Sequence, residues 1–425
     1  MINFDKDSSA GGYSIPQLDL SIKPGDIDEK FNSLFELTTV DDSLDYLGHP
    51  DSVLLKNGEI LTVFPSSHGE GAIRARISAD GGESYRNADE IMPESWKNSL
   101  ETPTVYRLSF TDGKTPDKLV LISGNPKWGD LPTPGGFNYS VSDDEGKNWT
   151  EFELCHTHLN GEKLLCVVAM ASLTQLKENG RFVDKWMAFF HSAPGFVNYK
   201  TILYFEDGKP CWSIPEPYFA QHREAEKISN MCEVECIRSE GGRGDELCLI
   251  SRSNSKKCNS LISFSQDEGR TWSEPVFAPA ALNGERHKAE YLADGRLFIT
   301  FRSIERDPRK VEQYSEREGR GWYSEGWVAW VGTYDDLKNG REGQYRIKIA
   351  HTYLPGQTEP QPCANSDVGY CGNVVLPDSM TVVTSTYGAF GKLNADGSLK
   401  TYVVSKRIDI TLTDELVHLN KMNKQ

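Results

Sequence analysis

A short turn motif occurs three times in the chain and constrains the fold more than any other sequence feature. It reads Ser-x-Asp-x-Gly-x-(Ser/Thr)-(Trp/Tyr) at residues 78–85 and 265–272, and residues 142–149 differ only by an Asn at the Ser/Thr position. In such a turn the Asp side chain accepts hydrogen bonds from backbone N–H groups, and the Gly takes a positive φ. The aromatic ring then packs the turn onto the sheet. Three copies, each preceded by a short β-like run, predict a repeat protein built from antiparallel strands.

The spacing of the motifs sets the size of the repeat. They begin at residues 78, 142 and 265, so they lie 64 and 123 residues apart, and the second distance is about twice 62. A degenerate copy stands between them at residues 206–209, and the same period places further turns near residues 334–336 and 394–397. Six units of this length, each with four antiparallel strands, are expected.

A second pattern gives the same number of units. Six polar reversals each separate two apolar runs, as in a hairpin: Asn57-Gly58, Asp112-Gly113, Asn179-Gly180, Gly241-Gly242, Asp294-Gly295 and Asp378-Ser379. The predicted fold is therefore all-β, a six-bladed β-propeller in which residues 46–410 form a single domain. Residues 1–45 are an N-terminal segment, whose alternating stretch at 13–22 is expected to close the ring. Residues 411–425 are a C-terminal tail.

Composition and charge exclude several classes of partner. The formal net charge of −16 repels phosphate groups, so neither nucleic acid nor an anionic membrane surface is an expected partner. No run approaches the roughly 18 apolar residues of a membrane span. The polar start shows no signal peptide, so a cytoplasmic location is expected. The nine scattered cysteines fit buried, reduced side chains, and neither a metal site nor a cofactor is expected.

The turn motifs, their period and the six units resemble the sialidase (neuraminidase) superfamily of Asp-box propellers over roughly residues 46–405. The resemblance implies an exo-glycosidase that hydrolyses a terminal acidic sugar with retention of configuration. In that family a Tyr paired with a Glu is the nucleophile, three arginines hold the substrate carboxylate, and an Asp is the acid/base. The turns themselves lie away from the mouth of the propeller, so the site residues have to be sought at the inner strands.

Inner-strand positions supply most of the expected site. Four residues lie eight positions before a hairpin reversal and so at one level of the ring: His49, Glu233, Arg286 and Tyr370. Two arginines end second strands: Arg252 and Arg302. By blade and order, Tyr370 matches the family nucleophile, and Glu233 matches its partner, with Glu235 as an alternative. Arg252 and Arg286 match two of the three arginines.

Two departures from the family pattern stand in the first blade. The chain reads Gly48-His49-Pro50 where the family has an arginine, so His49 replaces that residue and Arg302 is a candidate for the missing charge. The loop that should carry the acid/base Asp offers His68 and Glu70 instead. Both residue types titrate near neutral pH when suitably buried, and either is a candidate for the acid.

Two other functions are kept open. In a lyase acting on uronic-acid glycans, His49, His68 and Tyr370 would remove the C5 proton beside an arginine-neutralised carboxylate. In a non-catalytic carbohydrate-binding propeller, mutation of Tyr370 would leave binding intact and no glycan would be cleaved. Separately, the structural alternative for Arg252, Arg286 and Arg302 is an ion-pair ring with glutamates of the inner strands: Glu233, Glu235 and Glu285. The charged stretch at 303–326 is a candidate lid, and Trp128 and Trp327 are candidate stacking platforms for a sugar.

Overall fold

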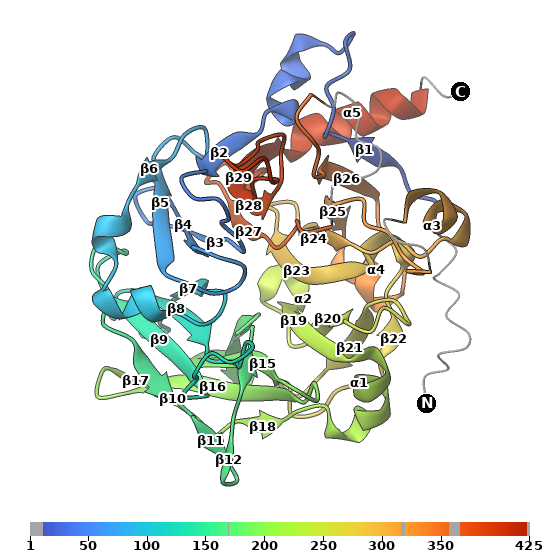
Figure 1. Cartoon of the computed structure of the whole chain (residues 1–425). Helices are drawn as coiled ribbons and strands as arrows, with labels where there is room; N and C mark the ends of the chain where they lie inside the picture. The colour runs from blue at the N-terminus through green and yellow to red at the C-terminus, as the bar shows by residue number, and fades with distance from the viewer. Residues whose placement is uncertain (1–11, 169, 316–318, 357–365, 423–425) are drawn as a thin grey trace.

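Six antiparallel β-sheets surround a central axis in the computed structural model (Figure 1), which describes residues 12–168, 170–315, 319–356 and 366–422. The arrangement confirms the predicted six-bladed all-β propeller. All six hairpin reversals found in the sequence join a first strand to a second strand. The first three blades contain β3 (Asp51–Leu54), β4 (Ile60–Pro65), β5 (Ile73–Ser78) and β6 (Arg86–Asn87); β7 (Thr104–Leu108), β8 (Lys118–Gly124), β9 (Phe137–Ser142) and β10 (Glu153–Cys155); and β13 (Cys166–Val167), β14 (Leu173–Glu178), β15 (Arg181–Ser192), β16 (Asn198–Glu206), β17 (Lys209–Trp212) and β18 (Glu216–Pro217).

The remaining blades follow the same plan. They contain β19 (Met231–Arg238), β20 (Leu247–Ser253), β21 (Leu261–Ser265) and β22 (Val276–Phe277); β23 (Gly284–Tyr291), β24 (Leu297–Ser303), β25 (Trp327–Gly332) and β26 (Tyr345–Ala350); and β27 (Gly372–Val375), β28 (Thr381–Gly388) and β29 (Tyr402–Asp409). In blade three, β13 and β14 both pair with β15 and divide the innermost strand into two pieces. A separate hairpin is formed by β11 (His158–Leu159) and β12 (Glu162–Lys163).

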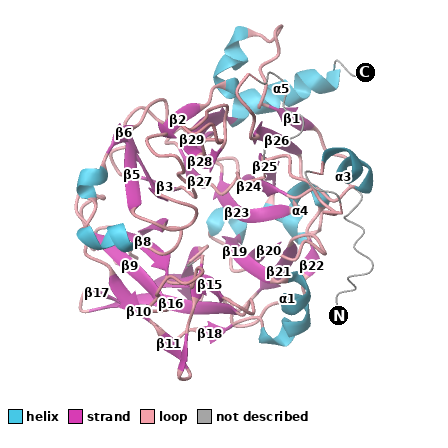
Figure 2. Cartoon of the chain, in the orientation of Figure 1, coloured by secondary structure: helices cyan, strands magenta, loops and turns pink. Residues whose placement is uncertain are grey.

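Helices are short and lie mostly at the periphery of the strands (Figure 2). The α-helices are α1 (Arg223–Ser229), α2 (Ser239–Gly242), α3 (Pro308–Tyr314), α4 (Tyr334–Lys338) and α5 (Ile410–Met422). The 3-10 helices are η3 (Glu29–Phe35), η4 (Asp89–Ile91), η5 (Glu94–Asn98), η6 (Ala220–His222) and η7 (Ala280–Leu282). None of the helices in the described part of the chain is long and apolar enough to span a bilayer.

The N-terminal segment completes the ring by a different strand from the one expected. Strand β2 (Thr38–Asp41) pairs antiparallel with β29 and becomes the fourth strand of blade six. Strand β1 (Gln17–Asp19), from the stretch expected to close the ring, pairs in parallel with β26 and adds a fifth strand to blade five. The reason is the free edge of β29. Because α5 follows β29 directly, the described part of the chain after β29 is helical, and β2 pairs with that edge instead.

The three full turn motifs make the predicted hydrogen bonds. Asp80, Asp144 and Asp267 each accept the backbone N–H of the residue four positions later, at 2.9 Å in every case. The glycines that follow them adopt φ angles of 91°, 78° and 73°. The aromatic residues Trp149 and Trp272 are buried against the sheets. Local turn chemistry therefore explains why this motif recurs between third and fourth strands.

The two turns extrapolated from the period differ from that pattern. Residues 334–336 belong to α4, which still joins the third strand of blade five to the fourth. Residues 394–397 form a turn between β28 and β29, which are the second and third strands of blade six. The outer turn is missing there because the fourth strand of that blade comes from the N-terminal segment.

An ion pair at two of these turns ties neighbouring blades together. Glu145 accepts hydrogen bonds from Arg107 at 2.7 Å and from the backbone N–H of Lys56, in the preceding blade, at 2.9 Å. In blade four, Glu268 accepts a hydrogen bond from Arg238 of the same blade at 2.6 Å and another from the backbone N–H of Lys177, in blade three, at 2.9 Å. We call each set an inter-blade clasp. Each clasp fixes one blade against the one before it, and an apolar cluster also joins each of these two pairs of blades.

Candidate active site

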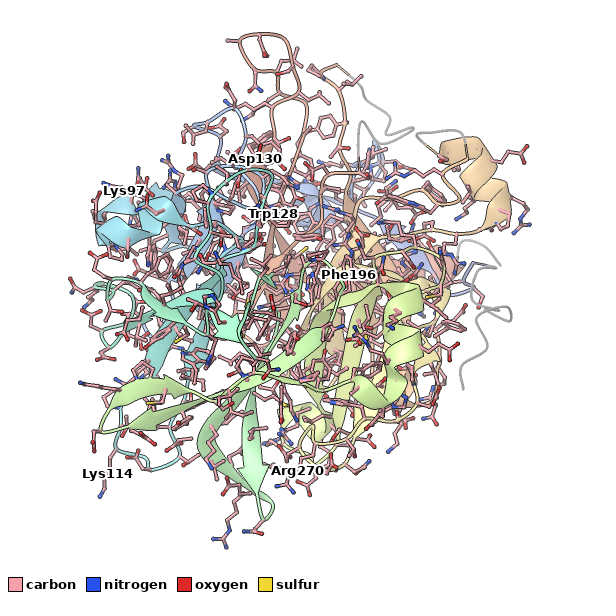
Figure 3. The ribbon with its side chains drawn as sticks, turned by 60° about the horizontal axis from the view of Figure 1, so that its bottom comes forward. Lys97, Lys114, Trp128, Asp130, Phe196 and Arg270 are labelled. Atoms are coloured by element: carbon pink, nitrogen blue, oxygen red, sulfur yellow. The ribbon has the colours of Figure 1, made fainter. Side chains whose placement is uncertain are left out.

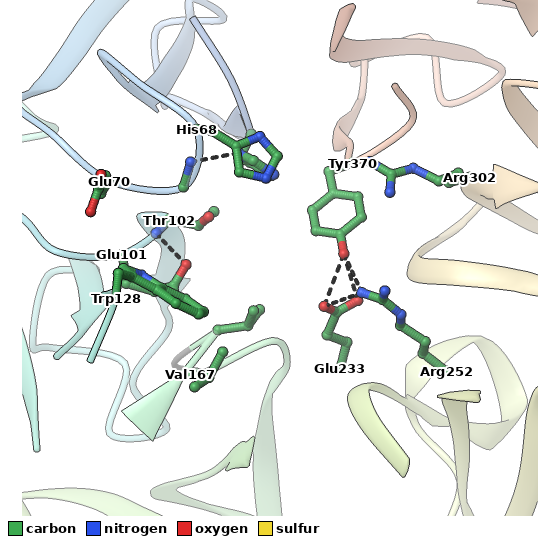
Figure 4. Close-up of a pocket in the computed structure, with 13 residues that line it drawn as sticks. His68, Glu70, Glu101, Thr102, Trp128, Val167, Glu233, Arg252, Arg302 and Tyr370 are labelled. Carbon is green, nitrogen blue, oxygen red and sulfur yellow. Dashed lines mark hydrogen bonds and ion pairs between the residues drawn. The ribbon is translucent and has the colours of Figure 1, made fainter. Parts of the chain in front are cut away.

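A pocket of about 520 Å³ opens at the propeller axis, and all six blades contribute to its walls. Figure 4 shows two facing sides, with Tyr370, Glu233 and Arg252 on one and His68, Glu70 and Glu101 on the other. Its volume lies within the usual range for small-molecule sites. The lining residues are His49, His68, Gly69, Glu70, Glu101, Thr102, Trp128, Val167, Val168, Glu233, Arg252, Arg302 and Tyr370.

Unusual backbone conformations stand where inner strands begin. His49, Glu233 and Arg286 have φ angles of 49°, 49° and 55°, in the left-handed region that non-glycine residues seldom adopt. In blades four and five these residues fall at β-bulges, where the register shifts between Cys232 and Glu235 and between Glu285 and Lys288. A bulge re-aims a side chain, at a strain of about 1–3 kcal/mol per left-handed residue. The repeated strain at one ring level marks this level as a candidate functional site.

Tyr370 and Glu233 form the central contact of the pocket. The phenolic hydroxyl of Tyr370 donates to Glu233, with its oxygen 2.9 Å from Oε1 and 3.1 Å from Oε2. Arg252 donates from Nη1 to Glu233 Oε1 at 2.6 Å and also to the Tyr370 hydroxyl. Burial raises the pKa of Tyr370 well above its ordinary value, although the guanidinium groups of Arg252 and Arg302 oppose the shift. The phenol is therefore neutral at physiological pH, and Glu233 is placed to accept its proton.

Two arginines of this wall share one buried carboxylate. Glu285 lies 3.1 Å from Arg252 Nη2 and 3.2 Å from Arg302 Nη1, and Lys256 Nζ approaches it to 2.7 Å. Burial alone would raise the pKa of Glu285, but these cations outweigh burial and bring it to about 2. The Arg302 guanidinium also lies 4.7 Å from the centre of the Tyr370 ring. An ion-pair cluster of the kind considered from the sequence is thus part of the site, with Glu233 and Glu285 in it.

His49 lines the pocket and carries no charge. Its ring packs 4.9 Å from that of Tyr370 and 4.4 Å from that of Tyr387, and its Nδ1 accepts the backbone N–H of Gly69 at 3.1 Å. Burial lowers the pKa of His49 well below its ordinary value, and the nearby His68 and arginines lower it further. His49 is therefore neutral and does not supply the charge of the arginine that it replaces.

His68 lies on the opposite side of the pocket with 63% of its side chain exposed. Its Nδ1 is hydrogen-bonded to the hydroxyl of Tyr46, and that hydroxyl donates to Asp367 Oδ2 at 2.7 Å. The ring of His68 also stands edge-on to that of His49, at 4.8 Å between centres. The sequence placed His68 in the first-blade loop but gave no sign of the two residues that hold it.

Glu101 is a site residue that the sequence analysis missed. It lines the pocket with 2% of its surface exposed, and its Oε1 accepts the backbone N–H of Thr102 at 2.8 Å. Its Oε2 is buried with no hydrogen-bond partner in the described structure, as is Oε2 of Glu70. Burial raises the pKa of Glu101 to about 7. Glu101 lies just before β7, the inner strand of blade two. Counting eight positions back from Asp112-Gly113 leads to the first residue of β7 instead, so this rule did not select Glu101.

Two expected substrate-binding residues are absent from the pocket lining. Arg286 is buried and donates from Nη1 to the carbonyl of Ala171 at 3.0 Å. Glu235 accepts the backbone N–H of Ala289 at 3.1 Å, and burial raises its pKa to about 7. The bulges explain both positions, because an extra residue in the inner strand breaks the regular alternation that the predictions assumed.

The two candidate stacking residues have different environments. Trp128 lines the pocket on the loop after β8 (Figure 3), is 39% exposed, and donates from Nε1 to the carbonyl of Leu100 at 3.1 Å. Trp327 has no exposed surface and belongs to the core around β25, so its prediction as a sugar platform was wrong. Of these two candidates, Trp128 is the one that lines the pocket.

The stretch at 303–326 lies near the side of the pocket that carries Arg252 and Arg302, but none of its described residues lines the pocket. It includes α3, and residues 316–318 fall outside the described structure. The Lys256 ammonium lies 4.8 Å from the ring of Trp322 and also binds Glu285, so it connects this stretch to the site. The lid remains a prediction. Within the described ranges, no cluster of three or more His, Cys, Asp or Glu side chains is arranged to hold a metal ion.

Comparisons with known proteins give matches of structure only. No protein-family model matches the chain, and no curated protein sequence does. Among solved structures, a GH93 α-L-arabinofuranosidase of Fusarium graminearum in complex with arabinobiose has a TM-score of 0.56 and 14% identity, covering 89% of this chain and 98% of that one.

Two sialidases have the same fold. The NanB sialidase of Streptococcus pneumoniae gives a TM-score of 0.52 at 11% identity, covering 91% of this chain and 73% of that one. A Trypanosoma rangeli sialidase, in complex with 2,3-difluorosialic acid as a covalent intermediate, gives a TM-score of 0.51 at 14% identity, covering 95% and 62%. These matches show that the chain shares the fold of these solved structures.

Proposed function

We propose that the protein is a glycoside hydrolase that removes a terminal sugar from a glycan with retention of configuration, with Tyr370 as the nucleophile. The observation that carries the proposal is the hydrogen bond from the Tyr370 hydroxyl to both oxygens of Glu233, at the wall of an open axial pocket. A phenol of raised pKa needs such a base to become nucleophilic. Solved propellers of this fold that cleave glycosides support the class of reaction.

The residues of the two facing sides divide the reaction between them. As the glycosidic bond breaks, the Tyr370 oxygen attacks the anomeric carbon and Glu233 takes the phenolic proton. Arg252 binds both groups and favours the negative charge that develops on the phenolic oxygen. A group on the facing side protonates the leaving oxygen and then activates the water that releases the sugar. His68 is the proposed acid/base, and Glu70 is the alternative.

The sugar that we propose is acidic, sialic acid or a related one. Arg252 and Arg302 stand on the same wall as the nucleophile, and paired guanidinium groups suit a planar carboxylate. A carboxylate next to the anomeric carbon also favours a neutral phenol over an anionic carboxylate as the nucleophile. Both arginines already bind Glu285, so we expect weaker binding of the acidic sugar than three unpaired arginines would give.

The direct test is turnover of fluorogenic glycosides by the wild type and by Tyr370→Phe. The substrates are the 4-methylumbelliferyl glycosides of N-acetylneuraminic acid and of glucuronic acid, with the α-L-arabinofuranoside as an uncharged comparison. We expect the wild type to cleave an acidic substrate and Tyr370→Phe to lose roughly 10³-fold or more in kcat. Glu233→Gln should lose about 10²- to 10⁴-fold, because its proton-accepting role is removed.

The outcomes separate the parts of the proposal. Cleavage of the arabinofuranoside alone, still dependent on Tyr370, would overturn the acidic sugar and keep the hydrolase. Full activity of Tyr370→Phe would overturn the nucleophile. Binding of a glycan without cleavage of any would favour the carbohydrate-binding propeller instead.

A lyase is the second candidate, because His68, Tyr370 and Arg302 face the same pocket. In this reaction a base removes the C5 proton of a uronic acid beside a neutralised carboxylate, and the 4-substituent leaves. The neutral His49 is not that base at Nδ1, since this atom accepts the N–H of Gly69. Appearance of an unsaturated product absorbing in the ultraviolet, with no hydrolysis of aryl glycosides, would decide for the lyase.

A further inference from the structure

A chain of two hydrogen bonds links His68, through the hydroxyl of Tyr46, to the carboxylate of Asp367. Asp367 Oδ2 accepts the hydroxyl of Tyr46 at 2.7 Å, and the oxygen of that hydroxyl is hydrogen-bonded to His68 Nδ1. The His68 Nδ1 atom lies 3.7 Å from Asp367 Oδ2 itself. His68 and Tyr46 come from the first blade and the segment before it, whereas Asp367 precedes the inner strand of blade six.

The direction of each hydrogen bond follows from the groups involved. A carboxylate only accepts, so Tyr46 must give its single hydroxyl hydrogen to Asp367. The Tyr46 oxygen then has only lone pairs to offer, and His68 Nδ1 must carry a hydrogen and donate it. In the neutral imidazole the lone pair is therefore on Nε2. His49 shows the opposite arrangement, because its Nδ1 accepts from Gly69 and its hydrogen is on Nε2.

The second oxygen of Asp367 is also occupied. Its Oδ1 accepts the hydroxyl of Tyr387 at 2.7 Å and lies 3.6 Å from Arg302 Nη2. Two phenolic hydroxyls and a guanidinium thus hold the carboxylate in one orientation. The charged and titratable groups around His68 are then Asp367 and Tyr46 at Nδ1, the neutral His49 at its ring edge, and the pocket carboxyls Glu70 and Glu101.

From this geometry we infer that Tyr46 and Asp367 are positioning residues, which fix the Nδ1–H form of His68 and direct its Nε2 to the leaving oxygen of the substrate. The inference rests on the proposed glycosidase function. In the first step the protonated imidazole gives its Nε2 proton to the glycosidic oxygen as the bond to the anomeric carbon breaks. In the second step Nε2 takes a proton from the attacking water, which restores the imidazolium. Asp367 stabilises the imidazolium through the Tyr46 hydroxyl and by its charge 3.7 Å from Nδ1, a role similar to that of the carboxylate in a Ser-His-Asp triad, where the contact is direct.

The first test reads the tautomer and needs no substrate. In the protein labelled with ¹⁵N-histidine, the resonance pair lost in His68→Gln identifies His68. We expect this pair to report Nδ1–H in the neutral imidazole of the wild type, and to shift to the commoner Nε2–H form in Tyr46→Phe. The matched control is Tyr387→Phe, which removes the other phenolic donor to Asp367 and leaves the tautomer unchanged. An Nε2–H form of His68 in the wild type would overturn the inference.

The second test measures kcat and KM for aryl glycosides whose leaving groups differ in basicity. We expect His68→Gln to lose about 10²- to 10⁴-fold on a poor leaving group and far less on an activated one, because only the poor one needs a proton. Tyr46→Phe and Asp367→Asn should show the same dependence on the leaving group, with kcat lowered about 10-fold on the poor leaving group and much less on the activated one, while KM stays within twofold. A leaving-group effect in Glu101→Gln or Glu70→Gln, with none in His68→Gln, would overturn it.

The two tests also separate this inference from the proposed function. If no glycoside is cleaved, the proposed hydrolase fails, whereas the tautomer of His68 still answers whether Tyr46 and Asp367 orient it. If cleavage depends on Tyr370 but no variant of Tyr46 or Asp367 lowers kcat on the poor leaving group, the hydrolase stands and the positioning role falls.

Discussion

At the residue scale, two buried carboxyl groups of one site have pKa values displaced in opposite directions. Glu101 has no cation beside it, so burial dominates and raises its pKa from 4.5 to about 7. Glu285 is as deeply buried, but Arg252, Arg302 and Lys256 outweigh burial and lower its pKa to about 2. The protein thus keeps one carboxyl ready to hold a proton near neutral pH and the other permanently ionised.

We predict a pH-dependent stability change for Glu101→Gln. Because the pKa of Glu101 is raised in the folded state, its contribution to stability is complete below about pH 4.5 and is lost as the pH rises through 7. Above that range the wild type carries a cost of roughly 3 kcal/mol that the uncharged variant avoids. Urea unfolding at pH 4.5 and pH 8 should therefore show the variant gaining on the wild type only at pH 8.

Glu285→Gln is the control of opposite sign. The pKa of Glu285 is lowered in the folded state, so its contribution is present above about pH 4.5 and is lost as the pH falls toward 2. The variant should be less stable than the wild type at pH 8, since it leaves three cations without their shared partner. The same sign of change for both variants at pH 8 would contradict this account of the site.

At the element scale, the inter-blade clasps show that the turn motif both reverses the chain and binds one blade to its neighbour. Glu145 and Glu268 occupy the same position of the motif, and each joins an arginine of its own blade to the backbone of the blade before. In the first motif this position is Gly81, so that turn has no such clasp. Single turns thus contribute to packing between sheets as well as to the sheets themselves.

We predict that the two clasps differ in strength because they differ in burial. Arg238 and Glu268 expose 4% and 18% of their side chains, whereas Arg107 and Glu145 expose 21% and 26%. Removing one partner of a buried pair costs about 3–5 kcal/mol, and exposed pairs contribute only about 0–1 kcal/mol. In urea unfolding, Glu268→Gln should therefore destabilise more than Glu145→Gln. An equal decrease in the free energy of unfolding for the two variants would show that burial of the ion pair does not determine how much each clasp contributes to stability.

At the scale of the whole molecule, the ring is closed by a strand that comes from far away in the chain. Strand β2 pairs with β29, so the first and last parts of the propeller are joined in blade six. The segment before it is also attached: Lys406 donates to the carbonyl of Leu20 at 2.6 Å, and β1 pairs with β26. Strands β1 and β2 of the N-terminal segment are therefore part of the propeller domain.

We predict that deleting residues 1–41 is much more damaging than deleting residues 1–22. Both deletions remove β1, but only the longer one removes β2 and η3 and leaves the edge of β29 unpaired. The difference should be about 5 kcal/mol, because Phe31, Leu34 and Val40 each bury a side chain worth roughly 1.5–3 kcal/mol. Unfolding curves and size-exclusion profiles compare the two proteins, and similar stability would mean that β2 does not close the ring.

Much of the fold was predictable because it depends on local chemistry. The turn motif places its Asp, Gly and aromatic residue within eight positions, so its hydrogen bonds are determined within the motif itself. The regular spacing then gives the number of blades. Tyr370, Glu233 and Arg252 were also found from the sequence, because each lies at a constant distance from a hairpin reversal or at a strand end.

The sequence by itself thus determined the six-bladed architecture, the outer turns and one wall of the candidate site. Only the tertiary structure decided that β2 closes the ring, that bulges take Arg286 and Glu235 away from the pocket, and that Glu101 faces it. It also decided that Tyr46 and Asp367 meet at His68. The physical reason is range: a turn is stabilised by its own few residues, whereas a bulge, a ring closure or a hydrogen-bonded chain depends on partners that only the completed ring brings together.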